Sequence, residues 1–456
     1  MKNNKSLIIV AIILLNVLVI FMVGQSFLGN MNEYDKAVKQ ARELAEQDLC
    51  GKSIDKYNEA AALDNNAELR IEMLDVYQKG IESGEISNIY NVVSEVTLMV
   101  DTFQKDISVY ESACDFLIKY EKYEECANIL KQAAALKLSS DKLDKALETI
   151  RYKYAKYFAM YTGVQPMCDD MFTVLNEDGT YGFLNNEASP ELDGGYVSAS
   201  SFSEGYAYIK ILNLDGTENS IVIDKEGKRL FYLDGVESSS GVGKAFDKSN
   251  NQIYLLSCKV GNVYKYYDAN GKVAFGEYAF AGRFRNNVAA VKESDGTWKL
   301  INGEGKPISD KKFKDVILNE FDECAPKGLI IAKESDKYHI YQLDAEKYTI
   351  KQVGDFSCDG AKAFVDEYAA FKSGDLWGFV GADGKVIIDA QYEDAKSFSN
   401  KMGAIKTNGM WSFINPNNEV VIEETFEDVS YLSGNGICFA KSDGYWSYLK
   451  MYYTNN

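Results

Sequence analysis

The segment LWGFVGADGKVIIDAQYEDAKSF, residues 376–398, contains the pattern that decides the fold of most of this chain. An aromatic residue opens an alternating stretch, W-G-F-V, the chain reverses at Asp383-Gly384, and a second apolar stretch, K-V-I-I, follows. Alternation on both sides of a short Gly-containing turn is typical of β-hairpins. An aromatic-acidic corner, Y-E-D, then leads to a further strand, M-G-A-I-K at 402–406. We therefore expect three short antiparallel strands in this unit.

The same order of features recurs along residues 163–456. All four tryptophans occupy the first slot of a unit, and aromatic residues fill most of the other first slots at steps of 34 to 44 residues. The predicted structural repeat anchors are Tyr181, Tyr264, Trp298, Tyr338, Trp377, Gly378, Trp411 and Trp446, with Ser220 in the slot of a degenerate unit. Because one three-stranded sheet buries too little apolar surface to be stable alone, neighbouring units must stack.

These segments resemble the bacterial WG-repeat family. The Trp-Gly pair that names the family is complete at Trp377-Gly378, and Tyr181-Gly182 keeps the glycine behind a tyrosine. The stretch FSEGYA at 202–207 matches the later part of the family pattern, and the resemblance covers residues 168–456. It implies a repeat domain whose role is non-enzymatic and otherwise undefined.

The two ends of the repeat region predict closure. A lone strand at 171–176 precedes the first anchor, and an incomplete unit at 446–453 ends the region. Two incomplete units of this kind can complete one sheet and hide both edges, as in propellers. We expect seven or eight propeller-like blades, with an open, curved β-solenoid as the alternative. The predicted fold class is therefore segregated α and β: a transmembrane helix, an all-α segment and an all-β tandem repeat.

Residues 31–162 follow a helical period, as in EYDKAVKQARELAEQ at 33–47. Glycines at 51, 80 and 84 fall between the periodic stretches, where helices end. The spacing of Ala41, Leu44, Ser53, Tyr57 and Ala60 weakly resembles a tetratricopeptide unit, although the usual Gly and Pro positions are not kept. An irregular stack of helical hairpins, a peptide-binding concave face and a stalk all fit this pattern.

The first thirty residues predict export. Residues 7–24 are apolar except for Asn16, and about 18 helical residues span roughly 27 Å, close to the thickness of the hydrocarbon layer. Lys2 and Lys5 precede this stretch, so we expect an N-terminus inside and the bulk of the chain outside a single-pass membrane anchor. A cleaved signal peptide and secretion are the alternative. The predicted domains are 1–30, the cytoplasmic tail and anchor; 31–162, the helical segment; and 163–456, the β-repeat.

The composition excludes nucleic acid as a partner. The chain has a net charge of −19, which repels phosphate backbones. Eight cysteines are scattered without a C-x-x-C pair, and the single histidine, His339, has no cysteine near it in the sequence. We therefore expect no metal and no cofactor.

No catalytic motif is present in the sequence. There is no G-x-S-x-G, H-E-x-x-H or P-loop pattern, and the Asp-Gly segments are hairpin turns rather than calcium loops. We therefore predict a non-enzyme that binds or scaffolds a protein or glycan partner in the cell envelope. A carbohydrate-active enzyme with a carboxylate pair and an inert spacer are the alternatives.

Overall fold

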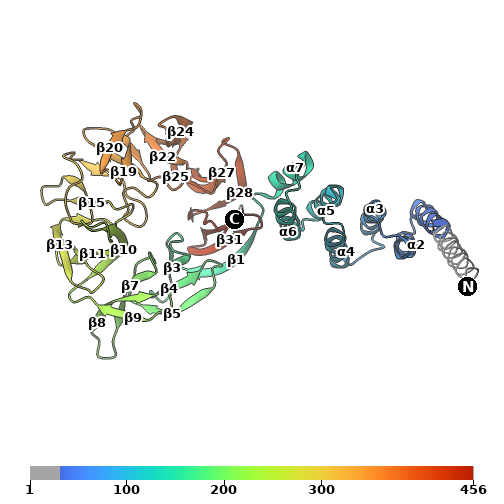
Figure 1. Ribbon diagram of the computed structural model, residues 1–456, viewed down its shortest axis with the longest axis horizontal. Helices are drawn as coiled ribbons and strands as arrows, with labels where there is room; N and C mark the ends of the chain where they lie inside the picture. Colours follow the sequence, from blue (N-terminus) through green and yellow to red (C-terminus); the bar gives the residue numbers. More distant parts are fainter. Residues whose placement is uncertain (1–30, 455–456) are drawn as a thin grey trace, which may run out of the picture. The chain divides into compact units, whose positions relative to one another are not determined.

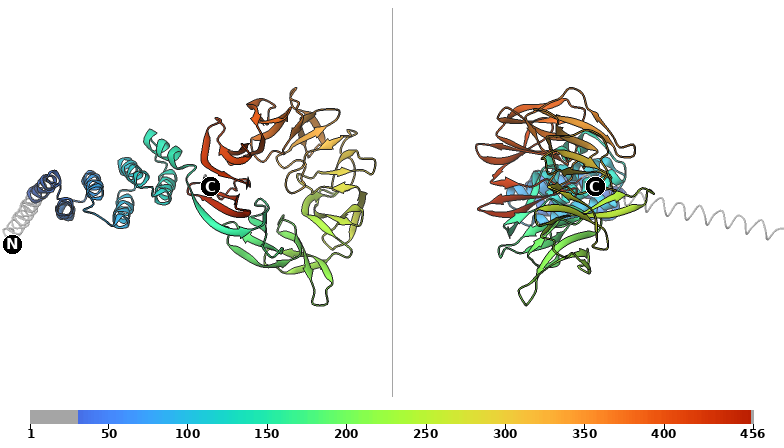
Figure 2. Two further views of the ribbon diagram at one scale, coloured as in Figure 1. Left: turned by 180° about the vertical axis from the view of Figure 1, so that it is seen from behind. Right: turned by 90° about the vertical axis from the view of Figure 1, so that its left-hand side faces the viewer.

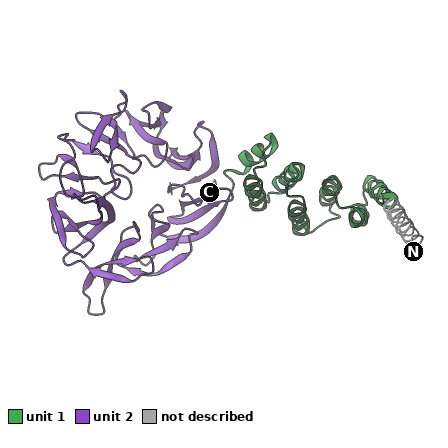
Figure 3. Ribbon diagram, viewed as in Figure 1, with its two compact units in different colours: residues 1–153 green, residues 154–456 purple. Residues whose placement is uncertain are grey.

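A computed structural model describes residues 31–454 of the chain. It divides into two compact units between Lys153 and Tyr154 (Figure 3). The first unit is entirely helical and the second entirely β (Figure 1). The segregation predicted from the sequence is therefore confirmed.

The helical unit consists of antiparallel helical hairpins. A first helix covers residues 31–46 of the described chain. It is followed by α2 (Cys50–Leu63), α3 (Ala67–Ser83), α4 (Ile89–Thr102), α5 (Ile107–Lys119), α6 (Tyr123–Ala135) and α7 (Asp141–Ile150). Several helices begin at a side chain that accepts a backbone hydrogen bond: Asn66 accepts from Leu69, and Ser140 from Leu143. Gly84 ends α3 in the left-handed conformation.

Small residues let neighbouring helices approach closely. Ala41, Ser53 and Ala60 are fully buried, and the Ser53 hydroxyl donates a 2.7 Å hydrogen bond to the carbonyl of Ala41. Cys114 and Cys126, which occupy similar slots on α5 and α6, are buried as well. The sequence pattern therefore identified helix-contact positions correctly, whereas the tetratricopeptide likeness stays a prediction.

The predicted membrane location is contradicted. Within residues 31–454, no helix is long and apolar enough to cross a lipid bilayer. The stretch 7–24, on which the prediction of a single-pass anchor rested, lies outside the described residues. We do not retain that location.

The β unit contains eight sheets arranged in a ring (Figures 1 and 2). The first four are β2–β5 (Gly163–Val164, Met171–Leu175, Tyr181–Asn185, Pro190–Tyr196), β6–β9 (Ser198–Ala199, Tyr206–Leu212, Glu218–Asp224, Arg229–Tyr232), β10–β13 (Ser238–Phe246, Gln252–Val260, Val263–Tyr267, Val273–Tyr278) and β14–β16 (Phe280–Ala281, Ala289–Lys292, Trp298–Ile301). The next three are β17–β20 (Asp315–Val316, Leu329–Lys333, Tyr338–Asp344, Thr349–Gln352), β21–β24 (Gly360–Ala361, Tyr368–Ser373, Leu376–Gly381, Val386–Tyr392) and β25–β28 (Asp394–Ser399, Met402–Thr407, Met410–Ile414, Val420–Phe426). The last contains β29 (Asp428–Val429), β30 (Ile437–Ser442), β31 (Tyr445–Met451) and β1 (Tyr154–Tyr161). Each sheet is a propeller blade whose first strand lies nearest the axis.

The ring closes because the two ends of the unit share one blade. β1 pairs antiparallel with β31, in the order β1-β31-β30-β29. The open solenoid is therefore not supported. The unit begins at Tyr154, whereas the sequence analysis placed the boundary at 162/163. The difference arises because β1 (YAKYFAMY) directly follows the helical pattern in the sequence. Its pairing partner lies about 290 residues away in the chain.

One blade, β14–β16, has three strands instead of four. Beside β16, only isolated bridges form, from Trp298 to Phe313 and from Ile301 to Pro307. Pro307 stands nine residues after its anchor, as Pro190 does at the start of the paired strand β5, so the proline alone does not account for the missing strand.

The core lies between adjacent blades. In the β21–β24 and β25–β28 blades, Phe379 and Phe398 meet with ring centroids 4.8 Å apart. The closing blade packs in the same way, with Phe439 and Phe172 5.1 Å apart. Full burial of one such ring stabilises the fold by roughly 1.5–3 kcal/mol. All eight interfaces are thus needed to cover the apolar faces of the sheets.

The predicted anchors occupy equivalent positions. The seven aromatic anchors all stand at the start of the third strand of a blade; Trp298, Trp411 and Trp446 are buried, and the other aromatic anchors are half-buried. A lysine of the second strand lies opposite most of them in register, as Lys406 does opposite Trp411. Gly378 follows Trp377 at a point where the outer strand β24 approaches closely.

Replacing Gly378 by Ala should destabilise the propeller. The added Cβ would lie against the carbonyl oxygen of Ile388 and 2.7 Å from the amide nitrogen of Ala390. These are backbone atoms, so the strands must separate, at a cost of about 1–3 kcal/mol. Gly182→Ala is the matched control, because its nearest neighbouring atom is 3.5 Å away. Urea unfolding followed by tryptophan fluorescence should show a lower midpoint for Gly378→Ala alone; equal midpoints would contradict the close approach.

Candidate binding site on the propeller axis

The connections between the first and second strands of the blades gather on the axis. Several of them close with two consecutive residues of positive φ, at Asp169-Asp170, Glu204-Gly205, Asn286-Asn287 and Asn400-Lys401. This backbone is that of type I′ turns, whose twist matches that of the flanking strands. In four blades the connection starts with A-x-x-F, and the phenylalanines of this motif are buried: Phe202, Phe284, Phe364 and Phe398.

One connection is longer and crosses the axis. Between β17 and β18 the chain runs through residues 317–328, about twice the length of most other connections of this kind. We call this segment the axial loop. It approaches the β14–β16 blade at Gly282, where a Cβ would lie 2.5 Å from the carbonyl oxygen of Asp322. The equivalent positions of other blades hold Ser200, Lys362 and Lys396, so glycine makes room for the loop here.

A buried ion pair holds the axial loop. Arg283 donates from Nε and Nη2 to Oε1 of Glu323, at 3.0 and 2.8 Å, and both side chains are almost fully buried. The guanidinium also lies 4.9 Å from the ring centroid of Phe321 and 3.5 Å from Sγ of Cys168. The second carboxylate oxygen of Glu323 accepts from the amide of Asn319 at 2.9 Å. Three segments of the ring, the connections that hold Arg283 and Cys168 and the axial loop, are thus joined through one guanidinium.

Two further acidic residues of the axial loop reach other blades. The hydroxyl of Ser240 donates to Oδ2 of Asp322 at 2.6 Å, and burial raises the pKa of Asp322 despite this hydrogen bond. Loss of solvent around Tyr431, and then the charge of Glu320, raise the pKa of that phenol. The axial loop is therefore tied to blades on several sides of the ring.

Two cavities open on the same face of the propeller. One, of about 620 Å³, is lined by first connections of seven blades, and the other, of about 1440 Å³, lies above the β10–β13, β14–β16 and β17–β20 blades. They share Glu204, Arg285, Pro326 and Lys327, so they form one continuous surface, which we call the turn-face recess. Its other polar lining residues include Lys244, Asp247, Lys248, Asn250, Glu304 and Glu346. The recess therefore carries both signs of charge together with the aromatic side chains of Phe246 and Tyr348.

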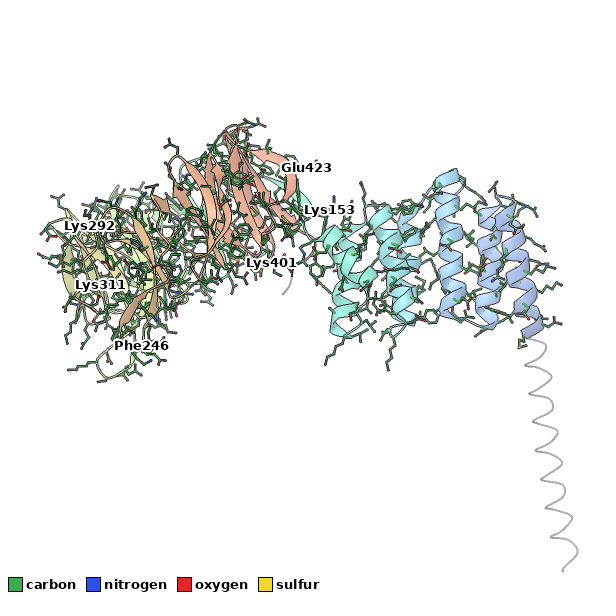
Figure 4. All side chains as sticks on the ribbon, turned by 90° about the horizontal axis from the view of Figure 1, so that it is seen from above. Lys153, Phe246, Lys292, Lys311, Lys401 and Glu423 are labelled. Atoms are coloured by element: carbon green, nitrogen blue, oxygen red, sulfur yellow. The ribbon has the colours of Figure 1, made fainter. Side chains whose placement is uncertain are left out.

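A third cavity, of about 790 Å³, opens on the opposite face. This cavity includes the turn between β15 and β16. Consecutive turns of an antiparallel sheet lie at alternate ends of the strands, so this turn lies at the end opposite the first connections. With the propeller seen edge-on in Figure 4, Lys292 of this cavity and Phe246 of the turn-face recess lie on opposite sides. We call it the lysine pocket. Its main lining residues are Phe280, Lys292, Trp298, Ile317, Leu318, Asp322 and Lys362.

The environments of Cys168 and of the single histidine do not activate a nucleophile, and no metal cluster lies within the described residues. Burial raises the pKa of the Cys168 thiol even though Arg283 opposes the shift, so this thiol is not an activated nucleophile. Nδ1 of His339 lies 3.0 Å from the carbonyl oxygen of Phe356, in a strand away from the axis. Within residues 31–454, no group of three or more His, Cys, Asp or Glu side chains is placed to bind a metal ion.

Of the predicted anchors, only Trp298 lines one of these cavities. Sequence reasoning missed the axial residues Arg283 and Glu323. A signal was present, since the β unit has only three arginines and two of them, Arg283 and Arg285, lie in one connection. The partner of Arg283 on the axial loop could not be found from the sequence, because it depends on which blades face one another across the ring.

Comparison with known proteins agrees with the repeat assignment. A family model described as "WG containing repeat" matches residues 266–298, 377–411 and 411–446. The β unit thus contains WG repeats, as the resemblance predicted. A search of curated proteins finds no match.

Solved propellers are similar only at low identity. BamB from Moraxella catarrhalis is 12% identical over 65% of this chain and 97% of that chain, with a TM-score of 0.41. The WD40 domain of SCAP from fission yeast is 8% identical over 65% and 95%, with a TM-score of 0.42. We draw no functional conclusion from these likenesses.

Removing the axial cation should destabilise the propeller strongly. Arg283→Met leaves the Glu323 carboxylate buried without its partner, at a cost of about 3–5 kcal/mol. Arg283→Met with Glu323→Gln should recover part of this loss, because no charge is then left buried. Lys347→Met, which breaks an exposed pair with Asp344, should cost less than about 1 kcal/mol. Urea unfolding of the four proteins measures these differences, and equal losses in the two single variants would refute the role of Arg283 in neutralising the buried carboxylate.

The stability contributed by Asp322 should fall as the pH rises. Because burial raises its pKa in the folded chain, the folded state binds this proton more tightly than the unfolded state. The contribution is present at low pH and is lost as the pH rises through the raised pKa. Asp322→Asn should therefore unfold at a higher temperature than the wild type at pH 7, with the difference shrinking toward pH 4. A constant difference in melting temperature across this range would contradict the assignment.

Proposed function

We propose that this protein is a non-enzymatic binding or scaffolding module that holds a protein partner against the turn-face recess. The observation that carries the proposal is the continuity of the recess. Two cavities that share four lining residues present charged, amide and aromatic side chains from several blades on one rigid face. Such a surface suits a folded or extended polypeptide better than a small substrate.

The available cations favour a partner with acidic groups at its contact surface. No ion pair engages the side chains of Arg285, Lys244 or Lys248 within the described chain, whereas Lys327 pairs with Asp366 at 3.2 Å. Acidic lining residues are partly committed: Asp247 accepts hydrogen bonds from the backbone of its own turn, and Glu304 pairs with Lys306. The free positive charges are therefore the groups most ready to contact a partner.

The glycosidase alternative has no specific support. Two carboxylates that line the recess are engaged: Glu323 is paired with Arg283, and Asp169 accepts from the amide of Gly205 and pairs with Lys225. A glycosidase needs one free carboxylate and one protonated carboxyl that flank the substrate.

Affinity capture with charge-reversed variants tests the proposal. The full chain and Arg285→Glu/Lys244→Glu are used as baits for proteins of the source cells. The matched control is Arg229→Glu/Lys351→Glu, which reverses one arginine and one lysine on the outer strands β9 and β20. We expect a protein that binds the wild type and the control saturably, and binds the recess variant at least tenfold more weakly.

Two outcomes would count against the proposal. Capture that is equal for the recess variant and the control would place the contact elsewhere. Release of sugar from a glycan panel by the purified chain would overturn the non-enzymatic assignment.

A further inference from the structure

The lysine pocket gathers hydrogen-bond donors that no group of the protein satisfies. Trp298 is 8% exposed, and its Nε1 is buried without an acceptor. Among the described side chains, the only other buried nitrogen or oxygen in this condition is Nη1 of Arg283. A buried donor left without an acceptor costs about 1–3 kcal/mol. The indole N–H therefore marks a place where an acceptor from outside the chain is favourable.

Two lysines flank this indole. Lys292 and Lys362 line the same pocket, are half-buried, and have no carboxylate at ion-pair distance within residues 31–454. Nζ of Lys292 lies 5.7 Å from the ring centroid of Trp298, and Nζ of Lys362 lies 5.2 Å from that of Trp377. The aromatic rings hold both cations near the pocket wall without neutralising them.

Another blade shows what this arrangement looks like when the protein supplies the acid. Lys396 occupies the position equivalent to Lys362, and its Nζ also lies over an indole, 5.0 Å from the ring centroid of Trp411. There, however, the lysine donates a 2.8 Å hydrogen bond to Asp428 of the next blade. The corresponding acid contact is missing at Lys362, and the lysine pocket lies beside it.

The acidic residues of the pocket are occupied by other partners. Glu293 pairs with Lys299 at 2.9 Å, and Asp322 accepts from Ser240. The remaining wall is apolar and includes Phe280, Ile317 and Leu318. The pocket thus combines two ammonium groups without a carboxylate partner, an apolar wall and, among its lining residues, the tryptophan whose indole N–H has no acceptor.

We propose that the lysine pocket binds a carboxylate that is attached to an apolar group, such as the C-terminal residue of a peptide. The ammonium groups of Lys292 and Lys362 bind the carboxylate, the indole of Trp298 donates to one of its oxygens, and the apolar part packs on Phe280 and Leu318. This site lies on the face opposite the turn-face recess, so it does not depend on the proposed function.

Nuclear magnetic resonance of the indole N–H groups tests the site on the full chain. The chain has four tryptophans, and Trp298→Phe identifies the resonance of interest. N-acetyl-leucine represents a C-terminal carboxylate, N-acetyl-glutamic acid α-amide an acidic side chain, and N-acetyl-leucinamide a matched probe without a carboxylate. We expect a saturable shift of the Trp298 resonance with N-acetyl-leucine and none with the amide. A larger affinity for the glutamic acid probe would assign the carboxylate to an acidic side chain and still support the site.

The lysines provide the second arm. Lys292→Gln/Lys362→Gln keeps most of each side chain and removes both charges. It should weaken carboxylate binding at least tenfold, which corresponds to a loss of about 1.4 kcal/mol or more in binding free energy. Lys351→Gln/Arg229→Gln, on outer strands, should leave it unchanged. If Trp298→Phe does not fold, the resonance cannot be assigned, and calorimetric titration of the wild type and the lysine variant then measures the same affinities. No shift with either carboxylate, an equal shift with the amide, or unchanged affinity in the double-lysine variant would overturn the proposal.

Discussion

The propeller depends on the antiparallel pairing of β1 with β31. Without it, the last blade would have three strands and the first blade an uncovered apolar face, because Phe172 and Phe439 pack only when the ring is closed. Ring closure also fixes where the first connections of the blades converge. Every feature of the axis, including the axial loop and both of its cavities, follows from that one long-range pairing.

The axial loop turns a ring of similar units into an asymmetric molecule. An ideal repeat ring would place equivalent side chains at every blade, and several positions keep that equivalence, as the buried phenylalanines of the A-x-x-F motif do. The inserted residues break it by placing Glu323 and Asp322 beside Arg283 and Ser240. The buried pair is costly to desolvate, so its value lies in fixing the loop in one position across the axis rather than in net stability.

Charge is arranged unevenly on this acidic chain. Many lysines of the blades pair with a carboxylate, as Lys396 does with Asp428, whereas Lys244, Lys248, Lys292 and Lys362 have no ion-pair partner within the described residues. On one face they border a wide recess, and on the other they flank a buried indole N–H. These differences between the faces arise from single departures in repeat units, such as Gly282 in a slot that holds serine or lysine in other blades.

The sequence by itself determined the helical unit, the hairpins, the repeat spacing and the anchor slots. These features follow from local periodicity, because the side chains that define a strand or a helix lie within a few residues of one another. Only the tertiary structure decided the start of the unit at Tyr154, the number of blades, the path of the axial loop and the two binding surfaces. Their contacts join residues as distant in sequence as Cys168 and Arg283, 115 positions apart, and no local pattern specifies which blades meet across the ring.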